Sequence, residues 1–436
     1  MKKIFIILTF FLSFFILLDL IRSSNSIKAQ GNDHVPGQIL VKFKENTSQE
    51  EINRQLNGHR ASVKEKIEKL GVLVLRVPEV AQDQVLTALS KNTHVEFAEF
   101  DYLAETFTIP NDPDFGNQWG LENIGQTIQG VPGIIDVDID ASTAWNITQG
   151  GVKVAILDTG IDQYHEDLDS QIVVNKDFTG STSGYNDIYG HGTHVSGIVA
   201  ARTNNGMGGA GVCPNCQLMN GKVLNDSASG AYSWIASGIT WATDNGAKVI
   251  NMSLGGSTPS KTLESAVNYA WNNGVVVVAA AGNSGNTSKT YPAAYVNAIA
   301  VAATDNQDKK ATFSEYGSWV DVAAPGVHIY STWNDETSTS APYPVCYSPT
   351  QCYKYASGTS MSTPMTTGVV ALIWSTGKYT TASEVRSRLE LTADKITGTG
   401  TYWLAGRINA GNAVGDYIAP TPTPTPTSKP KPGRNK

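Results

Sequence analysis

Short, mostly apolar segments constrain the fold of this chain more than any other feature of its sequence. Helix-like stretches separate these segments, which span residues 152–157, 248–254, 275–280 and 298–302. They do not alternate apolar with polar residues, and strands of that kind are buried on both faces, as in a parallel sheet covered by helices. From Gln118 to Val414 the sequence therefore predicts a doubly wound α/β domain, with a mostly parallel sheet and helices on both faces.

A small α+β unit precedes this domain. We expect strands at Ile39–Phe43, Val72–Val77 and Val95–Phe100, and helices at 49–56 and 82–91 between them. Ser48 stands where the first helix needs an N-cap. Elements in this order predict a compact sandwich with helices on one face. We divide the chain into a leader, the small unit, the large domain and a tail, at 1–30, 31–107, 108–417 and 418–436.

The leader is typical of an export signal. Lys2 and Lys3 precede an apolar run from Ile4 to Leu18. The run approaches the length that spans a membrane, so cleavage near Ala29 and retention as an anchor both stay open. We expect a secreted or cell-envelope protein. The net charge of −7 gives no reason to expect a nucleic-acid partner. The Thr-Pro repeats of the tail favour extended polyproline geometry and a spacer or stalk.

Export places the four cysteines in an oxidising compartment. They lie as two local pairs in the sequence, Cys213/Cys216 and Cys346/Cys352, although other connectivities exist. A C-x-x-C pair also occurs in redox centres and as half of a zinc site. No histidine lies close to either pair, and the second pair has the wrong spacing for zinc. Two structural disulfides that close short loops are the favoured interpretation.

Four motifs carry the candidate chemistry. Asp158 ends an apolar strand, Asn283 follows another, and His191 and Ser360 each stand where a helix begins. A serine hydroxyl is a weak nucleophile that needs a neighbouring base, and imidazole is suited to that task near neutral pH. A buried carboxylate fixes the imidazole tautomer, while an amide and a helix-terminal N–H stabilise an oxyanion. Asp158 and Asn283 are expected at the same edge of the sheet.

The order of these motifs, within AILDTG, GHGTHVSG, AAAGN and SGTSMSTP, resembles the subtilisin family of serine proteases from about Pro110 to Val414. The resemblance implies an endopeptidase that acts on protein or peptide substrates through an acyl-enzyme. Asp158 would be the orienting acid, His191 the base, Ser360 the nucleophile and Asn283 the oxyanion donor. An inactive adhesin with the same fold, and an esterase with the same triad, are the alternatives.

The resemblance also assigns substrate contacts. It implies that an extended substrate pairs with the segment made of Ser253, Leu254, Gly255 and Gly256. It implies that Ala281 and Gly282 line the primary specificity pocket. Neither segment contains an acidic residue, so we do not expect a strict preference for basic side chains. An inserted segment before Ser360, which contains Cys346 and Cys352, is expected to shape the substrate cleft.

A structural calcium ion is a further implication of the resemblance. Calcium binds hard oxygen ligands. The residues that match the family's tight site are the side chains of Asp112, Asp167 and Asn205 and the carbonyls of Arg202, Met207 and Gly209. Solvated surface acids are the alternative. The family's second site, in the loop after Asp177, looks degraded here, because Gly180 and Thr182 stand where a relative has aspartates; Asp177 and Asp187 remain, and we assign no second ion.

The small N-terminal unit resembles the inhibitory propeptide of these proteases. This implies a self-processing precursor, with the unit acting as an intramolecular inhibitor of its own chain. The mature chain would begin near Thr108, which places Phe107 before the cut. An independent accessory domain is the alternative. We expect the mature protein to be a monomer.

Overall fold

The structure is a computed structural model that describes residues 34–102, 109–334, 345–348 and 351–415. The chain divides into two compact units, Met1–Thr106 and Phe107–Lys436, and each is considered by itself. The expected leader at 1–30, the expected cut after Phe107 and the tail at 418–436 lie outside the described residues. No helix within the described part of the chain is long and apolar enough to span a membrane.

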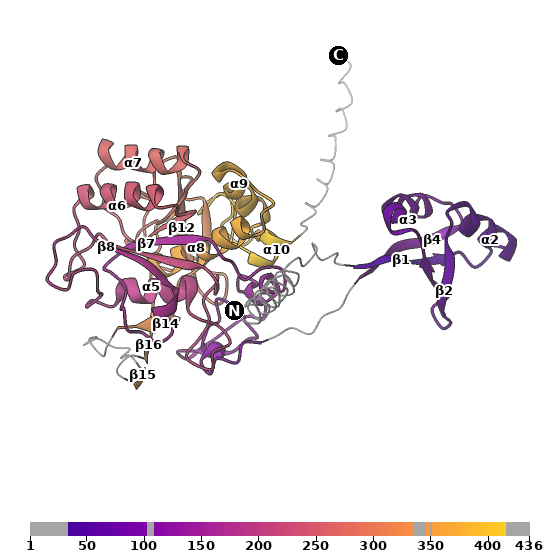
Figure 1. The fold of residues 1–436 in the computed structure, drawn as a ribbon, viewed down its shortest axis with the longest axis horizontal. Helices are drawn as coiled ribbons and strands as arrows, with labels where there is room; N and C mark the ends of the chain where they lie inside the picture. Colours follow the sequence, from indigo (N-terminus) through magenta and orange to yellow (C-terminus); the bar gives the residue numbers. More distant parts are fainter. Residues whose placement is uncertain (1–33, 103–108, 335–344, 349–350, 416–436) are drawn as a thin grey trace, which may run out of the picture. The chain divides into compact units, whose positions relative to one another are not determined.

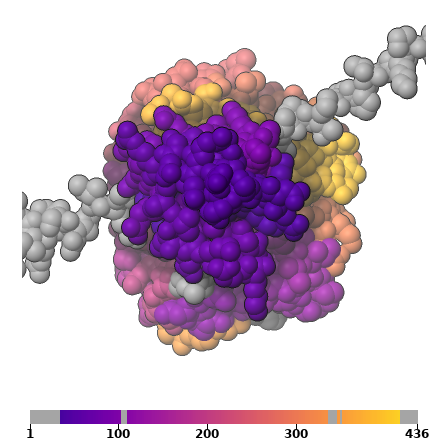
Figure 2. Space-filling model, turned by 90° about the vertical axis from the view of Figure 1, so that its right-hand side faces the viewer, coloured from indigo at the N-terminus to yellow at the C-terminus, as the bar shows by residue number. Residues whose placement is uncertain are grey.

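The small unit is a four-stranded antiparallel sheet in the order β2-β3-β1-β4, with helices α2 and α3 (Figure 1). Its elements are β1 His34–Phe43, α2 Gln49–Gly58, β2 Ser62–Ile67, β3 Val72–Arg76, the 3-10 turn Glu79–Ala81, α3 Gln82–Ser90 and β4 Val95–Tyr102. Leu56, Val85 and Leu89 of the helices pack with sheet residues in one core. Figure 2 shows the surface of this unit in indigo.

The predicted elements of the small unit are confirmed, apart from one strand that we missed. The Ser48 hydroxyl accepts a hydrogen bond of 3.2 Å from the Glu51 amide, so it caps α2 as expected. Every residue of the missed strand β2 is exposed. A strand without a buried face leaves no hydrophobic alternation in the sequence, and hence no signal to detect.

The large unit contains a seven-stranded sheet in the order β13-β12-β11-β10-β7-β9-β8, in which all neighbouring strands are parallel (Figure 1). The strands are β7 Lys153–Asp158, β8 Ile172–Asp177, β9 Gln217–Lys222, β10 Val249–Met252, β11 Val276–Ala280, β12 Ala298–Thr304 and β13 Val322–Pro325. The four apolar segments of the sequence became β7, β10, β11 and β12.

Helices cover both faces of this sheet, as predicted (Figure 1). Val154 and Ile156 of β7 join a core with α5 His191–Ala200 and α8 Thr359–Ser375, whereas Ala155 and Leu157 join a second core with α6 Tyr232–Asp244 and α7 Lys261–Asn272. Successive residues of a strand point to opposite faces, so β7 needs apolar residues at each of its positions 154–157, all of which are buried. The remaining helices of this unit are α4 Ala141–Trp145, α9 Ala382–Thr392 and α10 Ala410–Val414.

Smaller elements complete the unit. A three-stranded antiparallel sheet has the order β14-β16-β15, and β5 pairs with β6. Their bounds are β5 Thr127–Ile128, β6 Val131–Pro132, β14 Ile329–Trp333, β15 Val345–Ser348 and β16 Gln351–Ala356, and 3-10 turns span Phe115–Asn117 and Asp169–Gln171. Disulfides join Cys213 to Cys216 and Cys346 to Cys352, which confirms the local pairing.

Candidate active site

Three neighbouring strands bring the candidate residues to one edge of the parallel sheet. Asp158 is the last residue of β7, Ser253 directly follows β10, and Asn283 comes shortly after β11. The three strands are adjacent in the order β11-β10-β7. His191 is the first residue of α5, and Ser360 is the second residue of α8. The sequence motifs therefore converge at the carboxyl edge, where ligand sites of open α/β sheets lie.

Asp158 and His191 form a close pair. The Asp158 side chain is fully buried, and its Oδ1 atom accepts hydrogen bonds from His191 Nδ1 at 2.7 Å and from the Thr159 amide at 2.8 Å. Burial alone would lower the pKa of His191. The charge and hydrogen bond of Asp158 outweigh that effect, with help from the charge of Asp187, so the pKa of His191 is raised. Because Nδ1–H faces the carboxylate, Nε2 is the basic nitrogen of the neutral ring.

Helix α5 can approach β7 because residue 192 is a glycine. A Cβ atom on Gly192 would overlap the carbonyl oxygen of Gly160 and lie 3.2 Å from the Cβ atom of Asp158. Any larger residue would push α5, and His191 with it, away from the strand that carries Asp158. This requirement explains the glycine that follows the histidine.

A second carboxylate holds the start of α5. Asp187 is buried and accepts hydrogen bonds of 2.7–3.0 Å from the Thr159 hydroxyl, the Tyr189 and Gly190 amides, and the amide and hydroxyl of Thr193. These bonds satisfy backbone amides at the beginning of α5 and connect α5 to Thr159, the residue after Asp158. Asp187 therefore fixes the geometry of the Asp158–His191 pair without touching the imidazole.

His194, in the same motif, has a structural role. It is fully buried, its Nε2 atom donates to the carbonyl oxygen of Lys354 at 3.0 Å, and its ring packs against Trp333. Burial lowers the pKa of His194 to about 3. It is therefore neutral over the physiological range and does not compete with His191 as a base.

A chain of hydrogen bonds ties the start of α8 to β10. The Ser253 hydroxyl donates to the backbone oxygen of Ser360 at 2.8 Å and accepts from the Asn251 side chain at 3.0 Å. Asn251 in turn accepts from the Thr367 hydroxyl at 2.9 Å. Asn251 and Thr367 are fully buried. We did not single them out in the sequence, because nothing in a lone strand asparagine or helix threonine indicates such a bridge.

The side chains of Ser360 and Asn283 face one pocket. The Ser360 hydroxyl donates to the carbonyl oxygen of Ser253 at 3.2 Å in this structure. The Asn283 Oδ1 atom accepts from the amide and the hydroxyl of Thr359, at 2.9 and 3.0 Å. These two bonds fix the orientation of the amide, so the Nδ2 donors point away from Thr359. Both Asn283 and Ser360 line a pocket of about 460 Å³.

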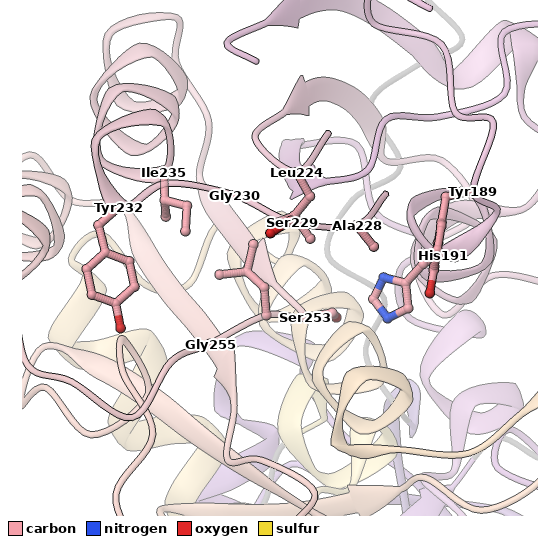
Figure 3. Close-up of a pocket in the computed structure, with 11 residues that line it drawn as sticks. Tyr189, His191, Leu224, Ala228, Ser229, Gly230, Tyr232, Ile235, Ser253 and Gly255 are labelled. Carbon is pink, nitrogen blue, oxygen red and sulfur yellow. The ribbon is translucent and has the colours of Figure 1, made fainter. Parts of the chain in front are cut away.

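A second pocket, of about 370 Å³, adjoins the first through the shared lining residues Ser253, Leu254 and Gly255. Figure 3 shows His191 and Tyr189 at one end of it and Tyr232 at the other. The segment 228–230 also lines it, a contribution that we did not predict. No hydrogen bond from another described residue reaches the backbone of Leu254 or Gly255. Their amide and carbonyl groups can therefore pair with an added strand.

The expected pocket residues need one correction. Ala280 and Gly282 line the larger pocket, but Ala281 is fully buried in a cluster with Val320 and Trp403. Alternate residues of an extended segment face opposite sides, so Ala281 faces the interior when Gly282 faces the pocket. Gly256 also lines this pocket, but its amide and carbonyl are paired with Tyr291 at 2.9 and 2.8 Å, so of the expected segment Leu254 and Gly255 keep backbone groups available for an added strand.

The residues expected to hold calcium also lie together. The side chains of Asp112 and Asp167 are buried, and Asn205 connects them: its amide nitrogen contacts Asp167 Oδ1 at 2.7 Å, and its backbone N–H donates to Asp112 Oδ1 at 3.0 Å. Burial raises the pKa of both carboxyl groups, that of Asp167 to about 7.

The donor set of this cluster suits a hard cation. The hydrogen bonds of the described residues include none to the carbonyl oxygens of Arg202, Met207 and Gly209. The described part of the chain contains no group of three or more His, Cys, Asp or Glu side chains that could hold a metal ion. A cation at this site would therefore need amide and carbonyl oxygens as ligands in addition to the carboxylates of Asp112 and Asp167. Calcium accepts such mixed oxygen ligands.

The inserted segment lies against this cluster, and no described residue of it lines either pocket. The Tyr353 hydroxyl donates to Asp167 Oδ2 at 3.2 Å, and the Tyr347 hydroxyl donates to Asp114 at 2.9 Å. We expected the segment to shape the substrate cleft. The described residues instead brace the region of Asp112 and Asp167, because their tyrosine hydroxyls find partners there.

Comparisons with known proteins agree with this arrangement. Residues 149–412 match the family model described as the subtilase family, and residues 22–101 match the fervidolysin N-terminal prodomain. Thermitase of Thermoactinomyces vulgaris is 48% identical over 307 residues, which cover 70% of this chain and 99% of thermitase. The thermophilic serine proteinase of Bacillus sp. (strain AK1) is 41% identical over 397 residues, which cover 90% of each protein.

A solved structure is also similar. It belongs to proteases from Pseudoalteromonas arctica PAMC 21717, with a TM-score of 0.60 and 33% sequence identity. The match covers 70% of this chain and 99% of that one.

The effect of Asp158 on the pKa of His191 can be tested directly. In the Ser360→Ala protein, an NMR titration should give His191 a pKa above the ordinary value of about 6.5. Asp158→Asn should lower the pKa of His191 below that value, because it removes the charge and leaves the burial. His194 is the internal control and should stay neutral throughout. An unchanged pKa of His191 in the Asp158→Asn protein would contradict the proposed pairing.

Proposed function

The chain belongs to the subtilase family, and from this premise we propose that it is an exported endopeptidase that cleaves peptide bonds through Asp158, His191 and Ser360. It is a subtilisin-type serine protease with an N-terminal prodomain. The observation that carries the proposal is the 2.7 Å contact between Asp158 and His191. His191 lines the smaller pocket, and Ser360 and Asn283 line the larger pocket that adjoins it.

The reaction begins with an extended substrate on the segment Ser253–Gly256, where it adds a strand to the free backbone of Leu254 and Gly255. The Ser360 hydroxyl turns from the Ser253 carbonyl toward His191 Nε2, which removes its proton as the oxygen attacks the scissile carbonyl carbon. Asp158 holds the imidazole by Nδ1–H and stabilises the imidazolium that forms.

The oxyanion of the tetrahedral intermediate lies between Asn283 Nδ2 and the backbone N–H of Ser360. Thr359 holds Asn283 in the required orientation, so the donor needs no rearrangement during the reaction. The imidazolium then gives its proton to the leaving amine, and the acyl group remains on Ser360. Water, deprotonated by the same imidazole, attacks the ester and releases the second product.

The prodomain supports a precursor form. We propose that the small unit inhibits its own catalytic domain until the chain cuts itself between the two units, near Phe107 and Thr108. The raised pKa of His191 has a consequence for the mature enzyme: only the neutral imidazole is a base, so activity increases with pH through the pKa of His191 and persists at alkaline pH.

We propose that calcium stabilises the mature enzyme. The ion would be held by the side chains of Asp112, Asp167 and Asn205, with the carbonyls of Arg202, Met207 and Gly209. These residues come from the start of the catalytic unit and from two loops that are distant in sequence. A cation bound there would neutralise two buried carboxylates and hold the three segments together.

The oxyanion role of Asn283 is testable by substitution. Asn283→Ala should lower kcat by roughly 10²–10³ with little change in KM, because the donor acts on charge that develops only in the transition state. The measurement is steady-state hydrolysis of a peptide substrate. Asn273→Ala, an exposed position after α7 that lines neither pocket, is a control that should keep kcat. A change confined to KM would mean that Asn283 contacts only the bound substrate.

The calcium proposal predicts a linked change in stability. For the Ser360→Ala protein, a hundredfold excess of calcium over Kd should add about 2.7 kcal/mol to the free energy of unfolding. EDTA should therefore lower Tm in calorimetry. Asp167→Asn should weaken the response, whereas Asp177→Asn should change it much less. A melting curve that EDTA leaves unmoved would show that these acids bind no ion.

A further inference from the structure

A glutamate lines the larger pocket and comes from a segment that we did not connect with it in the sequence. Glu315 follows β12 along the chain and is only 4% exposed, yet it belongs to the lining together with Gly282, Asn283 and Ser360. The pocket segments themselves contain no acid. The sheet topology thus adds a carboxylate to the pocket.

The Glu315 side chain occupies the space beside Gly282. A Cβ atom on Gly282 would overlap the Oε2 atom of Glu315, so residue 282 has to be a glycine for the carboxylate to reach the pocket wall. The backbone N–H of Glu315 donates to the Gly282 carbonyl oxygen at 3.0 Å, which fixes the two segments together. Gly282 also has a φ of 116°, in the region that favours glycine.

The carboxylate has hydroxyl donors but no cationic partner. Thr290 donates from its hydroxyl to Glu315 Oε2 at 3.0 Å, and the Ser284 side chain is a further donor. Among the described residues, no Lys, Arg or His forms an ion pair with Glu315. Lys289, which lines the same pocket, is exposed. A recessed carboxylate without a counter-charge favours a cation brought by the ligand.

We propose that Glu315 is a specificity-determining residue, which lets the pocket accept a lysine or arginine side chain at the substrate position before the scissile bond, in addition to apolar side chains. This rests on the proposed endopeptidase function. The methylene stem of such a side chain would lie along the pocket walls while its charged end reaches Glu315. The pocket segments alone indicated no such preference, because the acid comes from elsewhere in the chain.

The test compares kcat/KM for matched peptide p-nitroanilides that differ only in the residue before the scissile bond: Lys, Arg, Phe or Leu. Glu315→Gln keeps the size of the side chain and its bond to Thr290 but removes the charge. It should lower the Lys-to-Phe ratio by about ten- to a hundredfold, the range for loss of a charged hydrogen bond, and leave the Phe peptide nearly unchanged.

The control is Glu264→Gln, which removes an exposed carboxylate of α7 that pairs with Lys261. It should leave every ratio unchanged. As a binding readout, p-aminobenzamidine should inhibit the wild-type protein and lose potency in the Glu315→Gln variant. An unchanged Lys-to-Phe ratio, or an equal loss for all peptides, would overturn the proposal. Failure of the wild-type protein to hydrolyse any of the peptides would instead contradict the endopeptidase function.

Discussion

The parallel arrangement of β7, β10 and β11 is the constraint on which the rest of the catalytic unit depends. Because the strands run in one direction, their carboxyl ends meet at one edge. Asp158, Ser253 and Asn283 are brought together there although they are far apart in the sequence. Helices α5 and α8 then begin at the same edge and deliver His191 and Ser360. The catalytic geometry is thus a consequence of strand direction.

Buried polar groups convert this coarse placement into a defined site. Asp187 fixes the start of α5, and the bridge through Asn251 and Thr367 fixes the start of α8. An unsatisfied buried polar group is costly, so each bridge has one favourable arrangement. Rigid placement of His191 and Ser360 follows, as preorganised catalysis requires.

Much of this could be predicted from the sequence, and the exceptions have physical reasons. β7, β10, β11 and β12 were predicted because both faces of each are apolar. β9 was missed because it contains a charged residue, Lys222, which is unusual in a buried strand. Lys222 is nevertheless fully buried, since Asp226 pairs with its charge at 3.1 Å, and hydropathy does not show such a contact. Motifs indicated Asp158 and His191. Glu315 was missed because pocket walls are assembled from segments that only the fold brings together.

We propose that His191 activates Ser360 as a nucleophile. The most direct measurement is mass spectrometry after treatment with a fluorophosphonate, which labels an activated serine. We predict one covalent adduct on Ser360 in the wild-type protein and little labelling of Ser360 in the His191→Ala protein. Circular dichroism should show that the fold of this variant is intact. Equal labelling of Ser360 in both proteins, or a wild-type adduct on another residue, would contradict this proposal.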